Sequence, residues 1–251
     1  MRPVSETKWI SCVTPAGDKL VFAARPDLQE RSKSAVVLIH EVLGSAGQLA
    51  DWFGRLEPEA ELLLSVLPGH GAAPPLAARG FDQLVDAYEQ SLKVMLPGRR
   101  VLVAGAGLGG VLALALNARG YACVAFDPYF STAKQWPIES ALVQINGAAT
   151  ANADFLFDTL GWRDGALAEN RSYGGLLDRL KAPAMIVCGD APLSPQREIQ
   201  LAPSLMDEAD HALLAAYPDV RLKVLDGCGH DVLGQAPDIC REIILDELAR
   251  A

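Results

Sequence analysis

The sequence predicts an α/β protein with a mostly parallel central sheet that helices cover on both faces. Short, continuously apolar segments alternate with amphipathic segments from residue 35 onward, and strands that are apolar throughout are typical of a parallel sheet buried on both sides. A glycine-rich turn, with glycines at 105, 107, 109 and 110, joins one such strand to a helix. At 251 residues, we expect the whole chain, 1–251, to form a single domain.

The predicted strands begin with a hairpin. Residues 7–14 and 19–24 are rich in β-branched and aromatic residues, and they flank the turn formers Pro15, Gly17 and Asp18. Six short, apolar core strands are predicted after it, at residues 35–40, 61–67, 100–106, 122–127, 184–188 and 221–225.

Helical period and end signals predict the helices at residues 46–56, 81–96, 111–119 and 237–250. The second stops before Pro97 and Gly98, and the third ends at Gly120. The last one begins with Pro237, at the first helical position, where the missing N–H of proline costs nothing.

Residues 131–180 interrupt the alternation of strands and helices. A structureless loop of that length is improbable in a compact domain. We therefore expect a helical lid over the carboxyl edge of the sheet, lining an apolar pocket with aromatic residues that include Trp136 and Trp162. Each of these aromatics could equally serve to pack the lid onto the body of the domain.

Composition excludes several function classes. The net charge of −9, without a cluster of lysine or arginine, disfavours nucleic-acid binding. No apolar run is long enough for a membrane span, and the N-terminus lacks the apolar stretch of a signal peptide. Five widely spaced cysteines favour reduced thiols over disulfides or a zinc site. We expect a cytoplasmic protein with no metal and no cofactor.

Residues 101–114, VLVAGAGLGGVLAL, resemble the strand, elbow and helix of the α/β-hydrolase superfamily, whose usual pattern is G-x-S-x-G. Three further segments resemble that superfamily in order and spacing. They are VVLIHEVLGS at 36–45, similar to the strand and oxyanion loop, LPGHG at 67–71, and LDGCGH at 225–230, similar to the loop of the catalytic histidine. The resemblance is to esterases and thioesterases and implies the α/β-hydrolase fold with a lid.

A dinucleotide-binding loop is the alternative interpretation of the glycine-rich turn. The glycines do not give a clear G-x-G-x-x-G, because Gly110 would be the third glycine only through the start of the helix. The turn also follows the third core strand, whereas a dinucleotide-binding loop follows the first. The elbow is therefore the preferred interpretation.

The chain departs from the superfamily at its reactive groups. Gly107 stands at the nucleophile position, and residues 101–114 contain no serine, threonine or cysteine, so a serine or cysteine nucleophile is excluded. The resemblance makes His230 the catalytic histidine. Its acid partner is either Asp190, which lies beside the place that family members use, or Asp127 at the end of an earlier strand; Asp190 is preferred.

The oxyanion loop is altered as well, since Glu41 stands where the superfamily usually has glycine. A glutamate there resembles the dienelactone-hydrolase branch, which uses a cysteine at the elbow. The backbone N–H groups of Val42 and Leu108 are expected to form the oxyanion hole, because main-chain donors survive side-chain changes. Glu41 is predicted to line the pocket, either as a solvated or hydrogen-bonded group or as an ion-pair partner or base.

Three functions remain open. The chain could be a pseudoenzyme that binds a small apolar ligand or a protein partner. It could be a non-covalent enzyme, in which His230, oriented by Asp190, acts as general base on a small carbonyl substrate, directly or through a water above Gly107. It could be a carboxylic-ester or thioester hydrolase inactivated by a serine-to-glycine change at Gly107. The first is preferred, so whether the chain is an enzyme stays open.

Overall fold

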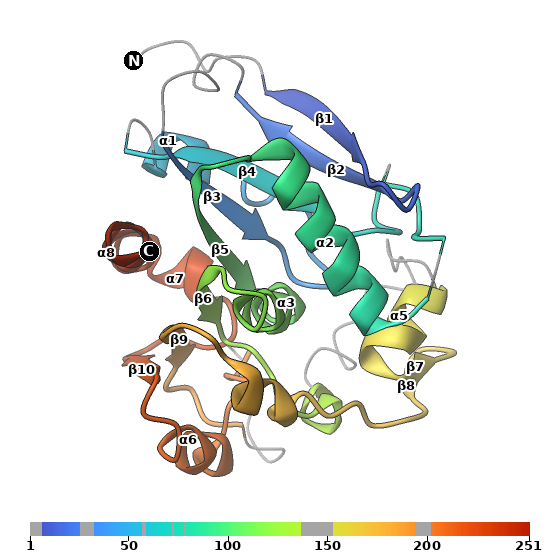
Figure 1. Ribbon diagram of the computed structural model, residues 1–251. Helices are drawn as coiled ribbons and strands as arrows, with labels where there is room; N and C mark the ends of the chain where they lie inside the picture. The colour runs from blue at the N-terminus through green and yellow to red at the C-terminus, as the bar shows by residue number, and fades with distance from the viewer. Residues whose placement is uncertain are drawn as a thin grey trace.

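A computed structural model describes residues 7–25, 33–56, 59–71, 73–77, 79–136, 153–193 and 202–251. Eight strands form one sheet in the order β1-β2-β4-β3-β5-β6-β9-β10 (Figure 1). They are β1 (Lys8–Val13), β2 (Lys19–Ala24), β3 (Ser34–Ile39), β4 (Glu61–Val66), β5 (Arg100–Ala106), β6 (Ala122–Phe126), β9 (Ala184–Gly189) and β10 (Val220–Leu225).

The sheet is mostly parallel, as the sequence predicts. Only the pairings of β1 with β2 and of β2 with β4 are antiparallel; the other pairings in this sheet are parallel. From β3 the chain passes to β4 on one side of it, and then to β5 on the other side, so the strand order reverses at β3. Open α/β sheets form their ligand sites at such a reversal, at the carboxyl ends of the strands.

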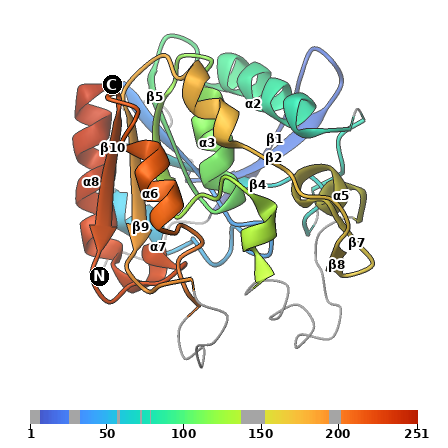
Figure 2. The ribbon, with the colours of Figure 1, turned by 90° about the horizontal axis from the view of Figure 1, so that it is seen from below.

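Helices cover both faces of the sheet (Figures 1 and 2). One face carries α2 (Phe81–Met95) and α3 (Leu108–Asn117), and the other carries α1 (Trp52–Leu56), α7 (Val232–Gln235) and α8 (Pro237–Arg250). A further helix, α6 (Glu208–Leu214), lies beside β10. The two-sided cover confirms the predicted fold class.

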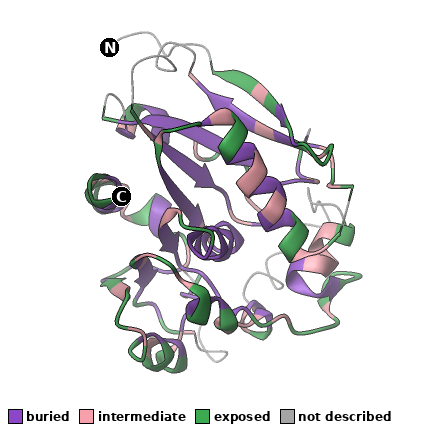
Figure 3. Ribbon diagram, in the orientation of Figure 1, coloured by how far each residue is buried: buried purple, intermediate pink, exposed green. Residues whose placement is uncertain are grey.

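Alternate residues of the core strands belong to two separate apolar clusters. Val37 and Ile39 of β3 pack toward α2 and α3, whereas Val36 and Leu38 pack toward α1 and α8. The central strands are therefore mostly buried along their length, while the outer surfaces of α2 and α8 face solvent (Figure 3). This is the reason that the core strands have apolar residues at successive positions instead of an alternating pattern.

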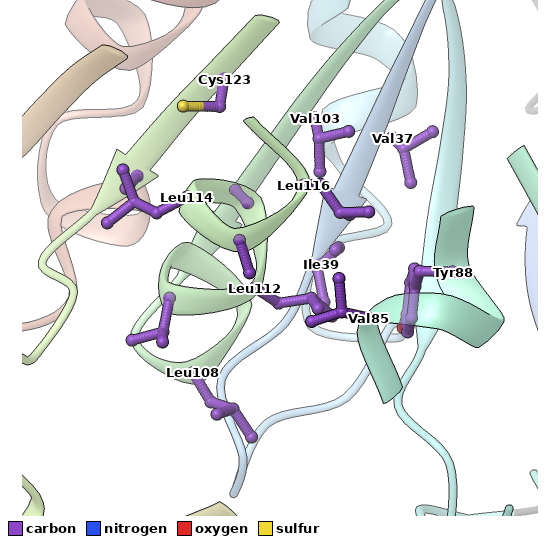
Figure 4. Close-up of a cluster of buried hydrophobic side chains, with 14 of the residues drawn as sticks. Val37, Ile39, Val85, Tyr88, Val103, Leu108, Leu112, Leu114, Leu116 and Cys123 are labelled. Carbon is purple, nitrogen blue, oxygen red and sulfur yellow. The ribbon is translucent and has the colours of Figure 1, made fainter. Parts of the chain in front are cut away.

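Helix α3 lies at the centre of the first cluster. All ten of its residues are buried, and Leu112 and Leu116 extend toward β3, β5 and α2 (Figure 4). A helix that is apolar on every side is expected where it is surrounded by protein. It begins at Leu108, three residues before the predicted start, because Gly107 at a φ of 51° turns the chain directly from β5 into the helix.

The predicted lid segment is less helical than expected in the part that the structure describes. Its described residues include an α-helix, a small antiparallel pair of strands and two short 3-10 turns: η2 (Thr132–Lys134), α5 (Ala153–Leu160), β7 (Trp162–Arg163), β8 (Ala166–Leu167) and η3 (Gly174–Arg179). Arg79 holds α5 near the start of α2 through ion pairs with Asp158 at 3.0 Å and Asp154 at 3.1 Å. Residues 137–152 lie outside the described residues, and the lid role stays a prediction.

All five cysteines are buried free thiols. Across the described ranges, no group of three or more histidine, cysteine, aspartate or glutamate residues is placed to hold a metal ion. No helix in the described part of the chain is long and apolar enough to cross a membrane.

The close packing of α3 on β3 makes Gly109 a stability-determining position. A Cβ on Gly109 would lie 2.4 Å from the backbone oxygen of Ile39, so we expect Gly109→Ala to lower the free energy of unfolding by about 1–3 kcal/mol. Urea unfolding measures the change. The matched control is Gly54→Ala in α1, where a Cβ would meet nothing within 4 Å. Equal destabilisation by both substitutions would contradict the packing argument.

Candidate active site

The carboxyl ends of the parallel strands bring together four groups that are far apart in the sequence. Glu41 follows β3, Gly107 follows β5, and Asp127 follows β6. His230 lies in the loop between β10 and α7. The predicted site residues Glu41, Gly107 and His230 therefore meet at one edge of the sheet.

Gly107 occupies the apex of the turn between β5 and α3. Its φ of 51° and ψ of −113° lie in a region that residues with a side chain rarely adopt. The neighbouring glycines permit close backbone contacts, since a Cβ on Gly105 would lie 2.3 Å from the carbonyl carbon of Gly109. The glycine pattern therefore serves the sharp turn that the elbow interpretation predicts.

Asp127, not Asp190, is the carboxylate next to His230, so the preference for Asp190 is wrong. Oδ2 of Asp127 lies 2.7 Å from Nδ1 of His230, and Asp127 is fully buried. Asp190 is exposed and accepts a hydrogen bond from the backbone N–H of Gly227 at 2.8 Å. Asp190 thus supports the loop that leads to His230, while Asp127, at the end of a strand closer to β5, reaches the imidazole.

Two residues that the sequence analysis did not find complete the surroundings of Asp127. The hydroxyl of Ser204 donates to Oδ1, and the backbone N–H of Leu205 donates to Oδ2 at 2.8 Å. The same segment holds the histidine loop, because the backbone N–H of His230 donates to the carbonyl of Ala202 at 2.9 Å. No local motif marks this segment, since it meets Asp127 only through the tertiary fold.

The carboxylate of Glu41 lies in the predicted oxyanion hole. Its Oε1 accepts the backbone N–H of Val42 at 2.6 Å, and its Oε2 accepts the backbone N–H of Leu108 at 2.8 Å. The same Oε2 lies directly over Gly107, at 1.1 Å from where a Cβ on that residue would stand. Glu41 therefore fills both the anion-binding position and the space that an elbow side chain would need.

His230 is placed between two carboxylates. Its Nδ1 faces Asp127 at 2.7 Å, and its Nε2 lies 3.6 Å from Oε2 of Glu41. Burial by itself would lower the pKa of His230, but the hydrogen bond with Asp127 and the negative charges of Asp127 and Glu41 outweigh burial and raise the pKa to about 10. At neutral pH the imidazole is therefore protonated.

Two buried histidines hold the backbone of the oxyanion loop. Nδ1 of His40 donates to the carbonyl of Glu41 at 2.6 Å, and its Nε2 accepts the N–H of Leu67 at 3.1 Å. This arrangement requires a neutral ring, and burial accordingly lowers the pKa of His40 to about 4. Nε2 of His70 donates to the carbonyl of Val42. With both carbonyls bound, the N–H of Val42 remains directed at the Glu41 carboxylate.

A cavity of about 380 Å³ adjoins the site. Glu41, His230 and Ala106 line it on the side of the site, and Leu49, Trp52 and Leu233 provide an apolar wall. Glu41 is thus a pocket residue, as predicted.

The two lid tryptophans are not among the residues that line this cavity. Trp162 is 2% exposed and belongs to the apolar cluster around α3, so its contacts are packing contacts. Trp136 is half-buried at the end of the described segment 79–136.

The arrangement can hold a carboxylate, but it has no side-chain nucleophile at the elbow. Acyl transfer through a serine requires a hydroxyl next to an imidazole that can accept its proton. Here the elbow carries no side chain, and the imidazole is already protonated. In this structure the two backbone N–H groups and the imidazole instead face the carboxylate of Glu41.

Comparison with solved structures supports the fold. E-2-(acetamidomethylene)succinate hydrolase is similar with a TM-score of 0.71 at 16% identity, covering 96% of this chain and 100% of that protein. The Pyrococcus furiosus esterase Pf2001 gives a TM-score of 0.70 at 16% identity, covering 98% and 90%. The Bacillus subtilis carboxylesterase CesB gives 0.71 at 14% identity, covering 99% and 93%. At these identities the likeness shows the fold alone.

A search of curated protein sequences found no significant relative. A family model described as "Alpha/beta hydrolase family" matches residues 36–243, which include the oxyanion loop, the elbow and the histidine loop. The chain therefore belongs to the α/β-hydrolase family.

Proposed function

We propose that this chain is a hydrolase-fold protein of esterase-like ancestry that has lost covalent catalysis. It binds a small molecule at the position of the former active site. The observation that carries the proposal is the position of the Glu41 carboxylate, which accepts hydrogen bonds from the N–H groups of Val42 and Leu108 above the bare α-carbon of Gly107. Those two N–H groups are the ones that would stabilise the oxyanion of an acyl-transfer intermediate. With the carboxylate there, a substrate carbonyl has no access to them.

General-base catalysis by His230 is less well supported. The contact between His230 and Asp127 orients the ring as a base would require. However, a pKa of about 10 leaves the ring protonated at neutral pH, without a lone pair to accept a proton. The space above Gly107, where a reactive water was expected, is taken by Oε2 of Glu41.

A hydrolase inactivated only by a serine-to-glycine change is also less well supported. A side chain at position 107 would overlap the Glu41 carboxylate. A serine there would therefore require Glu41 to leave the oxyanion hole. Gly107 leaves the space that the Glu41 carboxylate fills. A serine esterase needs a side chain at the first position and free N–H donors at the second.

The wild-type protein is expected to resist a fluorophosphonate probe and to leave p-nitrophenyl acetate unhydrolysed, because the elbow has no nucleophile. Gel fluorescence and absorbance at the p-nitrophenolate band measure the two properties. A catalytically inactivated serine hydrolase serves as the negative control. Labelling of the wild-type chain would show a reactive serine and refute the proposal.

Restoring hydrolysis should require two substitutions. Gly107→Ser supplies a hydroxyl, and Glu41→Gly clears the two oxyanion donors; clearing Glu41 also lowers the pKa of His230 toward the range of a base. We expect the double variant to exceed Gly107→Ser alone by roughly 10²-fold in ester hydrolysis, since a single oxyanion donor is worth about 10²–10³ in kcat. Glu41→Gly alone is the matched control and should stay inactive. Equal activity of Gly107→Ser and the double variant would contradict the role given to Glu41.

The charged state of His230 predicts a pH dependence of stability. Because the pKa of His230 rises to about 10 on folding from its ordinary value of 6.5, its stabilising contribution is fully present below pH 6.5 and is lost as the pH rises through 10. Urea unfolding from pH 6 to 10 should show this decline, and it should be smaller in His230→Gln.

The imidazole resonances of His230 give a direct measurement by NMR. They should show a protonated ring at pH 8 in the wild type, and Glu41→Gln should lower the pKa of His230 by removing one of the two carboxylates. A ring that is neutral at pH 8 in the wild type would contradict the predicted charge state.

A further inference from the structure

We infer that the carboxylate of Glu41 occupies a carboxylate-binding site of the protein. The external ligand of this site is an organic monocarboxylate with a short apolar tail. The inference rests on the proposed function and specifies its ligand. It arises from three features: the geometry of the donors around Glu41, the way in which Glu41 is attached, and the lining of the adjoining cavity.

The donors match a carboxylate group. The N–H of Val42 contacts Oε1, and the N–H of Leu108 contacts Oε2, so each oxygen has its own donor. Leu108 is the first residue of α3, whose positive end favours an anion. The imidazolium of His230 lies on the same Oε2 side at 3.6 Å. A single carbonyl oxygen could accept both N–H groups, but it carries no negative charge for the helix N-terminus and the imidazolium to stabilise.

Glu41 can be exchanged for an external carboxylate without rearranging the backbone. Its side chain is 17% exposed, and its backbone carbonyl is held by the ring Nδ1–H of His40 and by the N–H of Gly44. Rotation of the side chain alone releases both N–H groups. Gly107 provides the room for either carboxylate, because its α-carbon has no side chain there.

The residues that line the adjoining cavity determine which chemical groups the ligand can have beyond its carboxylate. The cavity volume of about 380 Å³ is in the range of small-molecule sites. Leu49, Trp52 and Leu233 present apolar surface, and no lysine or arginine is among its lining residues. Asp231, also in the lining, uses its carboxylate to accept the N–H of Gly234 at 3.0 Å. A second carboxylate on the ligand would therefore find no lysine or arginine in this lining to pair with, which disfavours dicarboxylates.

The competition with Glu41 determines the affinity. A site that its own side chain fills most of the time binds an external ligand more weakly, in proportion to the fraction of open molecules. Removal of the Glu41 carboxylate should thus strengthen binding. Sodium propionate is the probe, with propionamide as the neutral analogue and succinate as the dicarboxylate.

The experiment is an NMR titration of the His230 imidazole with propionate in the wild type, Glu41→Ala and Glu41→Gln. We expect Glu41→Ala to bind propionate at least about tenfold more tightly than the wild type, and the pKa of His230, lowered by the substitution, to rise again on binding. Propionamide and succinate should have no such effect. Glu41→Gln is the matched comparison: it keeps a side chain of the same size but removes the charge and sets an amide NH2 against one N–H donor, so its gain in propionate affinity should be smaller than that of Glu41→Ala.

A second cavity could bind propionate on its own account, since Arg99, Arg100, Arg221 and Arg250 are among the residues that line it. Arg100→Ala in the Glu41→Ala background tests this. Propionate binding that is unchanged by Arg100→Ala supports the inference, and its loss would overturn it. Should Glu41→Ala fail to fold, Glu41→Ser carries the same expectation because its side chain is also too short to reach both N–H groups.

The outcome distinguishes this inference from the proposed function. Equal propionate affinity in Glu41→Ala and the wild type would overturn the inference, while a wild-type chain that resists the fluorophosphonate probe would still support loss of the nucleophile. Labelling of the wild-type chain would instead refute the proposed function.

Discussion

The Glu41 carboxylate and the bare α-carbon of Gly107 share one small volume, and the site depends on that steric relation. A side chain at 107 would overlap Oε2 of Glu41, so only glycine permits the carboxylate to reach the N–H of Leu108. Gly107 also relieves a backbone conformation, with φ of 51°, that costs on the order of 1–3 kcal/mol for other residues. Steric fit and backbone strain thus favour the same residue, and both oppose a serine.

Charge balance explains the remaining side chains of the site. Two carboxylates on either side of one imidazole are stable only when the imidazole is protonated, and the buried Asp127 has further donors in Ser204 and Leu205. A buried carboxylate without such partners would cost several kcal/mol. The groups that orient a base in an esterase are therefore present, yet with Glu41 added they stabilise the cationic form of His230.

The scaffold around the site holds Glu41 and Gly107 in place. His40 and His70 bind the carbonyls of Glu41 and Val42, so they fix the shape of the loop after β3. The closely packed turn at Gly105 and Gly109 does the same for the elbow. These supports are backbone contacts and buried rings, so they do not depend on the side chain of Glu41.

The sequence by itself determined the fold class, the central strands and the position of Gly107, because continuous apolar strands and a glycine pattern are local signals. The resemblance of its segments to the α/β-hydrolase superfamily also placed Glu41, Val42, Leu108 and His230 in one site. Only the tertiary structure decided that Asp127 rather than Asp190 pairs with His230, and that Glu41 lies in the oxyanion hole. Both depend on which strand ends are neighbours and on side-chain direction, and neither property is encoded in the spacing along the chain.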